Sequence, residues 1–352
     1  MKRLRSTIIQ TGLDTMSLTG AHRLLRPIVG GIGLILMLHR VRPAVNANFQ
    51  PNRHLEITPD FLRLALEHLR AQDIDIVTMD EVCRRLNTRD FSRRFACFTF
   101  DDGYRDNRDH ALPVMQDFDA PLTVYVASDF ARGSGRLWWV TLERIVANVS
   151  AIEAKIGGEP IRLDASTIED KQNAFAQIHD RLRSLPTDHD VRDEVAALAR
   201  HHGIDDTLIA NELCMTWDEL RSFAARPLVT IGAHTVTHCN LAHESPEMAR
   251  QEMQLSRQRI ETALGDKVRH FAYPYGDKSA AGSREFAIAK SLGFETAVTT
   301  RPGVLFPEHT GHLTALPRIS LNGNYQSERF LPVLMSGAAT AIWNGFRRID
   351  AA

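Results

Sequence analysis

The chain has 352 residues, of which 43% are hydrophobic and 24% are charged, and its formal net charge is −1. This composition is typical of a soluble globular protein, and the length suits one large domain with an insertion, or two domains. A charge so close to zero excludes the overall attraction by which strongly basic proteins bind nucleic acid, so we expect no nucleic-acid partner.

Residues 1–30 are expected to form a basic helical segment. Up to position 26 this segment has one acidic residue, Asp14, and five basic ones: Lys2, Arg3, Arg5, Arg23 and Arg26. A basic helical segment can make peripheral contact with an anionic membrane surface. It can equally be a solvated helix that covers one end of the domain, and the sequence leaves both interpretations open.

The longest apolar run, residues 28–38, is too short to span a bilayer as a helix. It also starts late for a secretory signal, and no small-x-small cleavage site follows it. The four cysteines have no metal-ligand spacing, and a chain of this length needs no disulfide framework. We therefore predict a cytoplasmic protein, with a peripheral position at the inner membrane face as a further option.

Short apolar runs alternate with amphipathic stretches along most of the chain. The expected strands are Leu34–Leu38, Ile74–Val77, Phe95–Phe100, Leu122–Val126, Leu228–Ile231, His270–Tyr273, Thr296–Val298 and Leu316–Ile319. Helices with clear start or stop signals are expected after Thr58, from Ser245 to Leu264 and from Ser283 to Leu292. Strands that alternate with helices pair in parallel, so seven or eight of them indicate a closed (β/α) barrel. An open doubly wound sheet is the alternative, although no glycine-rich phosphate loop is present.

One stretch interrupts this alternation between about Gly133 and Asn211. Helical patterns cover Leu137–Val149, Ile168–Leu185 and Asp190–His202, with almost no strand signal. We therefore expect an all-helical insertion over residues 131–213, which divides the barrel into residues 31–130 and 214–325. Residues 326–352 are expected to add a C-terminal helix. Trp138 and Trp139 open the insertion, either as packing anchors or as a surface that carries a sugar ring.

Two polar motifs directly follow expected strands. Asp101 and Asp102 come after one of them, and His234 and His238 come after another. Polar groups at the C-terminal ends of barrel strands lie close together, and a helical turn would place both histidines on one side. One carboxylate and two imidazoles can hold a divalent metal and leave a position for water, while the other carboxylate acts as a base. The ligands suit zinc, and also iron, cobalt or nickel. Alternatively, Asp-Asp-Gly is an ordinary turn.

Together with Phe271-Ala-Tyr-Pro-Tyr275-Gly276, these motifs resemble the polysaccharide deacetylases of the NodB type, carbohydrate esterase family 4. The resemblance runs from about Leu34 to Ile319, interrupted by the insertion. It implies a distorted (β/α) barrel of seven or eight strands. It also implies a metal-dependent hydrolase that removes N-acetyl groups from an oligo- or polysaccharide containing N-acetylglucosamine, as a chitooligosaccharide deacetylase does.

The resemblance implies a role for each motif residue. Asp101 matches the catalytic base, and the metal ligands correspond to Asp102, His234 and His238. Tyr275 matches the residue whose backbone N–H helps to hold the oxyanion. The implied chemistry is hydrolysis in which Asp101 takes a proton from water and a further group protonates the leaving amine.

The sequence departs from the family pattern at two positions. Ala272 stands where many relatives have an arginine that orients the base, and Arg318 stands where many have the histidine of a Leu-x-His motif. We expect Arg318 to reach Asp101 from the last strand and to replace the missing arginine. The alternative is an arginine at the barrel rim that pairs with a carboxylate of the insertion.

The general acid is then unassigned. His39, at the end of the first strand, is one candidate, and His312, just before the last strand, is a weaker one. Two other functions also stay open: a glycan-binding protein of the same fold that has lost catalysis, and a hydrolase of cyclic amides or ureides. The complete set of metal ligands and the retained base argue against both.

Overall fold

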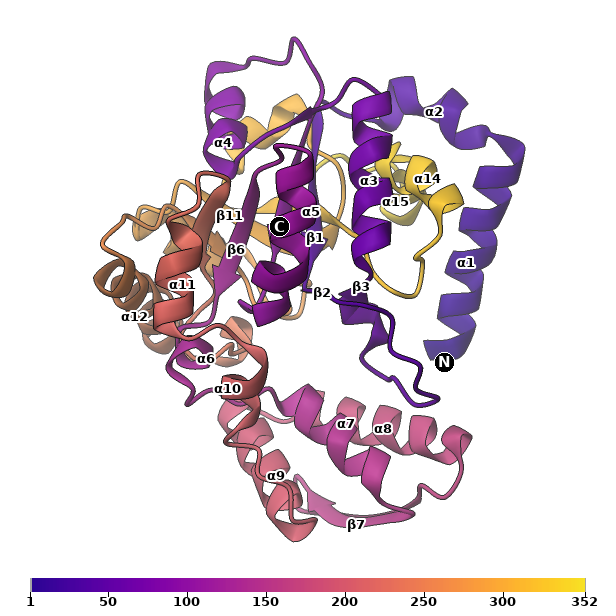
Figure 1. Ribbon diagram of the computed structural model, residues 1–352, viewed down its shortest axis with the longest axis vertical. Coiled ribbons are helices and arrows are strands. Elements are labelled where there is room, and N and C mark those ends of the chain that lie inside the picture. The colour runs from indigo at the N-terminus through magenta and orange to yellow at the C-terminus, as the bar shows by residue number, and fades with distance from the viewer. Residues whose placement is uncertain (1, 352) are drawn as a thin grey trace.

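A computed structural model of the chain describes residues 2–351 (Figure 1). Seven parallel strands close a barrel: β1 (Gly33–Leu38), β5 (Phe95–Phe100), β6 (Leu122–Val126), β9 (Val229–Ala233), β10 (His270–Ala272), β11 (Thr296–Pro302) and β12 (Leu316–Ser320). The barrel closes because β1 pairs with β12 on one side and with β5 on the other. All eight expected strands are present, and the closure confirms the (β/α) barrel over the open sheet.

The eighth expected strand lies outside the closed ring. It is β4 (Asp75–Ile76), which pairs with the first residues of β5. A second short pair, β2 (Arg40–Val41) with β3 (Glu56–Ile57), follows β1. The residues of β1, β5 and β6 are all buried, as expected for strands packed between a barrel interior and a helical layer.

Helices surround the barrel and follow the local sequence signals. They are α3 (Pro59–Ala71), α4 (Met79–Thr88), α5 (Leu112–Asp117), α6 (Ser128–Arg132), α11 (Trp217–Ala224), α12 (Pro246–Leu264) and α13 (Ser283–Ser291). The hydroxyl of Ser245 accepts the Met248 N–H at the start of α12, and Gly265, with φ 80°, ends that helix in the left-handed region. Thr58 caps α3 in the same way.

The insertion is a separate lobe at one end of the barrel (Figure 1). Its helices are α7 (Trp138–Asn148), α8 (Ile168–Arg183), α9 (Asp188–His201) and α10 (Ile209–Leu213). The prediction of an all-helical insertion is wrong, because β7 (Ala151–Ile156) and β8 (Glu159–Asp164) form an antiparallel hairpin. The signal was present in the sequence. Buried Ile152 and Ile156 alternate with exposed residues, and Gly157-Gly158, both with positive φ, supply the two-residue turn.

The two terminal segments pack against each other on the side of the barrel (Figure 1). The N-terminal segment forms α1 (Lys2–Thr19) and α2 (Ala21–Val29). The C-terminal segment forms two short helices, α14 (Leu331–Met335) and α15 (Ala338–Trp343), rather than the single helix expected, because Gly337 adopts φ 79° between them. None of the helices in residues 2–351 combines the length and hydrophobicity that crossing a bilayer requires. All four cysteines are buried and unpaired.

Candidate active site

The two neighbouring carboxylates at the end of β5 serve different partners. Asp101 and Asp102 are each only 2% exposed, although both are acidic. Asp102 has φ 73°, a left-handed backbone conformation that non-glycine residues rarely adopt. Asp101 pairs with an arginine inside the barrel, and Asp102 faces two imidazoles. The end of β5 therefore places one carboxylate next to the arginine and the other next to the two imidazoles.

Arg318 contacts Asp101 through two parallel hydrogen bonds. Its two terminal nitrogens donate to Asp101 Oδ1 at 2.8 Å and Oδ2 at 2.7 Å. The side chain of Arg318 is fully buried, so the alternative of a rim arginine paired with the insertion does not apply. Burial by itself raises the pKa of Asp101, but the Arg318 guanidinium outweighs burial and holds the pKa below its ordinary value. Asp101 is therefore ionised at neutral pH, as a base must be.

Two threonines fix the position of the arginine. Arg318 Nε donates to the Thr299 carbonyl at 2.8 Å, and a terminal nitrogen donates to Thr99 Oγ1 at 3.1 Å. Ala272, at the position of the usual family arginine, is a buried residue of β10. Neither threonine was predictable from the sequence, because a threonine inside a strand has no distinctive spacing.

Asp102, His234 and His238 converge on one point. Asp102 Oδ1 lies 3.5 Å from His234 Nε2 and 3.3 Å from His238 Nε2, and all three ligand atoms lie within 4.8 Å of one another. Although burial disfavours the charge of Asp102, the two imidazoles hold the pKa of its carboxyl well below the ordinary value. The structure therefore brings together the three ligands that the sequence indicates.

The chemistry of these donors fits a divalent metal ion. His234 Nδ1 donates to the Ala272 carbonyl at 2.7 Å, which leaves the lone pair on Nε2 facing Asp102. Asp102 Oδ1 is buried and has no hydrogen-bond donor among the described residues. A buried carboxylate oxygen without a donor is costly, and a cation between it and the two Nε2 atoms would satisfy it. Two imidazoles and one carboxylate suit zinc and the related metals named above.

The histidine pair does not lie on a helical turn, which corrects the sequence prediction. The segment from His234 to His238 is an irregular loop after β9, with Thr235 at φ 64° and His238 at φ 60°. Two carboxylates hold this loop. Glu252 of α12 accepts the N–H groups of Val236 and Thr237, and Asp188 of α9 accepts the N–H of Asn240. Neither acid has a sequence signal that separates it from other acidic residues on helices.

Tyr275, in the loop after β10, has a backbone φ of 60°. Its carbonyl accepts the Thr300 hydroxyl at 2.5 Å, whereas its N–H has no acceptor within residues 2–351. The Tyr275 ring lies 5.1 Å from the His238 ring, with centroids as end points. An unpaired backbone N–H can donate to a developing negative charge.

The insertion forms one wall of the site. Trp138 Nε1 donates to the Tyr275 hydroxyl at 2.9 Å, and Trp139 packs against His238 with ring centroids 5.0 Å apart. Trp139 Nε1 also donates to the Tyr104 hydroxyl at 3.2 Å. Both indoles are buried, so they are packing anchors rather than a surface for a sugar ring. The insertion thus packs against His238 and the Tyr275 loop.

The two histidines proposed as general acids differ in position. His39 Nε2 lies 3.9 Å from Asp101 Oδ2, and its side chain is 20% exposed. Burial lowers the pKa of His39 below its ordinary value, so the imidazole is neutral at pH 7. His312 is exposed and precedes β12, which places it at the opposite end of the barrel from Asp101. His312 is therefore not part of the site, and that candidate is wrong.

Comparison with known proteins gives the class of the molecule. The sequence model described as "Polysaccharide deacetylase" matches residues 88–155 and 175–297, more than half of the chain. The barrel and its site are those of a hydrolase that acts on carbon–nitrogen bonds in polysaccharides. The chain belongs to the polysaccharide deacetylase family, which confirms the resemblance seen in the sequence. A search among curated proteins gave no match.

Solved structures share the fold. One is the Streptococcus pyogenes deacetylase PplD in complex with acetate, with 18% identity, a TM-score of 0.54, and 83% of this chain and 92% of that chain covered. Another is IcaB from Ammonifex degensii, with 18% identity, a TM-score of 0.53, and 86% and 97% covered. At this identity the likeness shows the barrel fold and leaves the substrate to other arguments.

Proposed function

We propose that this protein is a metal-dependent deacetylase that removes N-acetyl groups from an oligo- or polysaccharide containing N-acetylglucosamine, as chitooligosaccharide deacetylases do. The observation that carries the proposal is the Asp102–His234–His238 cluster next to an ionised Asp101. Family membership supports the reaction class. The sugar and the metal are part of the proposal, with zinc as the first choice.

Each residue of the site has its own role in amide hydrolysis. Asp102, His234 and His238 would hold a divalent ion, which would supply the Lewis acidity that lowers the pKa of water and polarises a carbonyl. Asp101 takes the proton of the attacking water, and Arg318 keeps both carboxylate oxygens in a fixed orientation. The Tyr275 N–H donates to the oxyanion of the tetrahedral intermediate. Removing one such donor typically costs about 10²–10³-fold in kcat.

The leaving amine needs a proton, and we propose that His39 relays it. His39 is neutral at pH 7 and cannot donate at the outset. It lies next to the oxygen of Asp101 that gains the water proton, so it can receive this proton and deliver it to the nitrogen. If His39→Gln keeps wild-type kcat on every substrate that is turned over, Asp101 returns the proton directly and the relay is wrong.

Two other functions agree less well with the site. A glycan-binding protein needs no base, yet Asp101 is kept ionised inside the barrel by a buried arginine. A metal-free hydrolase of cyclic amides needs no cluster of two imidazoles and a carboxylate. A metal-free hydrolase also leaves the unsatisfied Oδ1 of Asp102 unexplained.

A screen for acetate release tests the proposal. The purified chain, supplied in turn with zinc, cobalt, nickel or iron, is incubated with chitin oligomers, peptidoglycan fragments and acetylated xylan. We expect release from one or both of the N-acetylglucosamine substrates. Bound metal and sugar affinity without acetate from any substrate would indicate the binding protein instead.

We also propose peripheral contact of the N-terminal segment with an anionic membrane. Leu24 and Ile28 of α2 are 81% and 68% exposed, and Arg23 lies beside them in the sequence. Exposed apolar and basic residues on one short helix favour such contact. Sedimentation with vesicles tests this contact. Phosphatidylglycerol vesicles should retain the wild-type chain and release Leu24→Asp. Equal recovery of the wild-type chain with phosphatidylcholine vesicles would contradict the contact. The cytoplasmic location stays a prediction.

A further inference from the structure

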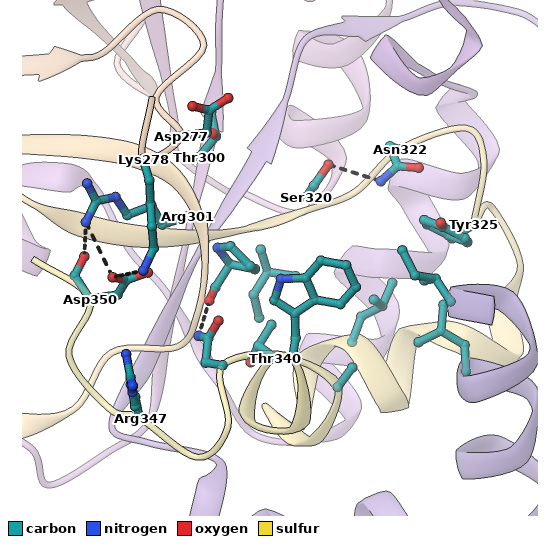
Figure 2. A pocket seen from close by; sticks show the side chains of 18 of the residues that line it. Asp277, Lys278, Thr300, Arg301, Ser320, Asn322, Tyr325, Thr340, Arg347 and Asp350 are labelled. Carbon is teal, nitrogen blue, oxygen red and sulfur yellow. Dashed lines mark hydrogen bonds and ion pairs between the residues drawn. The ribbon is translucent and has the colours of Figure 1, made fainter. Parts of the chain in front are cut away.

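A groove of about 880 Å³ is lined in part by the loop after β10, the loop that also carries Tyr275 (Figure 2). Its inner wall is formed by the ends of β11 and β12 and by the loop after β10, and its outer wall by α1, α14 and α15. Three of its residues connect it to the site. The Thr300 hydroxyl donates to the Tyr275 carbonyl, Asp277 follows Tyr275 by two positions, and Ser320 follows Arg318 by two. The groove is large enough for a ligand and adjoins the barrel mouth.

One end of the groove is charged (Figure 2). Lys278, Arg301 and Arg347 line it together with Asp277 and Asp350. Asp350 accepts from Lys278 at 2.8 Å and lies 3.5 Å from Arg301. Arg347 has no side-chain hydrogen bond or ion pair among the described residues. The three cations exceed the two carboxylates, so this end favours an anionic group.

The helical wall of the groove is largely apolar, with Ile9, Leu13, Leu334, Ala339 and Trp343. Polar side chains also line the groove, namely Ser320, Asn322, Tyr325, Thr340 and Asn344. Aliphatic side chains cannot hydrogen-bond sugar hydroxyls, so a sugar lying against the helical wall would leave the hydroxyls on that side unpaired. A hydrocarbon chain gains free energy in proportion to the apolar area that it covers.

The outer wall leads to an apolar surface. Seven of the eleven exposed large hydrophobic residues among the described residues belong to the terminal segments: Ile8, Leu18, Leu24, Ile28, Ile342, Trp343 and Phe346. Of these seven residues, Trp343 also lines the groove, and it is 49% exposed. A hydrocarbon chain longer than the groove would leave it beside Trp343.

We propose that the groove binds the lipid part of the substrate, which is a sugar joined through a phosphate to a long hydrocarbon chain. The acetylated sugar lies in the barrel mouth, the phosphate faces Arg347 and Lys278, and the chain lies along α1 and α15. This inference rests on the proposed deacetylase function and names its substrate class. It also gives the terminal segments a role in substrate binding.

Calorimetric titration of the metal-loaded full chain with dodecyl phosphate, below its micelle concentration, tests binding without relying on turnover. Inorganic phosphate and dodecyl maltoside are the comparison probes. We expect dodecyl phosphate to bind at least 100-fold more tightly than inorganic phosphate and at least ten-fold more tightly than dodecyl maltoside. Ile9→Glu and Arg347→Glu should each weaken dodecyl phosphate at least ten-fold.

Matched control variants lie one residue away. Ile8→Glu and Arg348→Glu change residues outside the groove and should alter affinity less than two-fold. If Ile9→Glu unfolds, Ala339→Trp fills the groove instead and should have the same effect. Acetate release is measured in parallel on chitin oligomers and on the dodecyl glycoside of N-acetylglucosamine. Ile9→Glu should raise KM for the dodecyl glycoside and not for chitin oligomers.

The two readouts separate the inference from the function on which it rests. Tight, groove-dependent binding of dodecyl phosphate without acetate release supports the lipid groove and contradicts the deacetylase. Acetate release from chitin oligomers without binding of dodecyl phosphate overturns the groove alone. Equal affinity for inorganic phosphate, or equal losses in the control variants, also overturns it.

Discussion

Arg318 and Asp101 are 217 positions apart in the chain, yet their side chains meet through two hydrogen bonds inside the barrel. The contact is possible because β12, which carries Arg318, and β5, which precedes Asp101, are both neighbours of β1 in the closed sheet. The family arginine is absent at Ala272, and a guanidinium from another strand supplies the charge.

Removal of Arg318 should reduce both turnover and stability. Arg318→Ala leaves the Asp101 charge buried without a partner, which typically costs about 3–5 kcal/mol of unfolding free energy. We expect kcat to fall at least about 100-fold, because the base loses its orientation. Urea unfolding and acetate release measure the two effects. Arg269→Ala, at an exposed ion pair, is the control. It should change neither the free energy of unfolding nor the activation free energy of turnover by more than about 1 kcal/mol.

Arg318→Lys distinguishes charge from geometry. Lysine keeps the positive charge but cannot donate two parallel hydrogen bonds from a planar group. We expect partial recovery of stability relative to Arg318→Ala, with kcat still reduced. Wild-type kcat in Arg318→Lys would mean that Arg318 does not orient the base.

Substitutions of the two adjacent aspartates should have separable effects. Asp101→Asn removes the base and should lower kcat by about 10²–10⁴-fold while the metal content stays near that of the wild type. Asp102→Asn removes a ligand and should lower metal affinity as well as turnover. Elemental analysis after dialysis, together with acetate release, tests both. Loss of metal in Asp101→Asn but not in Asp102→Asn would reverse the assigned roles.

The sequence predicted the barrel because its signals are local. Each strand is a short apolar run between amphipathic helices, and caps such as Ser245 with Gly265 mark helix ends. The cluster of Asp102, His234 and His238 was also predictable, because polar motifs that follow strands of one barrel meet at the same end of it. The hairpin at Gly157-Gly158 was missed although its strands alternate, because they are short, half exposed and come directly after a helical stretch.

The residues that hold the histidine loop could not be predicted from the sequence, for a different reason. Asp188 and Glu252 hold the histidine loop from two helices that are distant in the chain, and nothing in their local sequence sets them apart. The loop itself requires positive φ at Thr235 and His238, and a β-branched threonine rarely adopts that conformation. Only tertiary contacts explain that conformation.

Trp139 should tune metal affinity from the insertion. Its ring packs against His238, and its indole N–H donates to Tyr104. Residues that orient metal ligands typically change affinity by about 10–100-fold when replaced, so we expect a loss in that range for Trp139→Phe. Competition with a chelator measures it. Trp217→Phe, on α11 outside the site, is the control, and equal losses in both variants would argue for a general packing effect.

The buried His309 should make the folded protein less stable in acid. Burial lowers its pKa to about 4, and the Phe306 N–H donates to its Nδ1, which must be unprotonated. The unfolded chain binds a proton near pH 6.5 and the folded chain only near pH 4, so His309 favours folding above pH 6.5 and this contribution is lost as the pH falls. The loss approaches roughly 3 kcal/mol.

The measurement for His309 is urea unfolding of the wild type and His309→Asn between pH 7 and pH 4. The wild type should lose more stability over this range than the variant, because asparagine does not titrate. Parallel curves for the two proteins would show that His309 is not responsible for the acid sensitivity.

The central claim is tested most directly by the coupling of metal to turnover. The chain is stripped with a chelator and titrated with zinc, and bound metal and acetate release from N-acetylglucosamine oligomers are measured on the same samples. We expect acetate release to rise in proportion to bound zinc and to level off at one ion per chain, with no release from His234→Ala at any loading. Acetate release that persists in the stripped protein, or a fully loaded protein that releases none, would contradict the account.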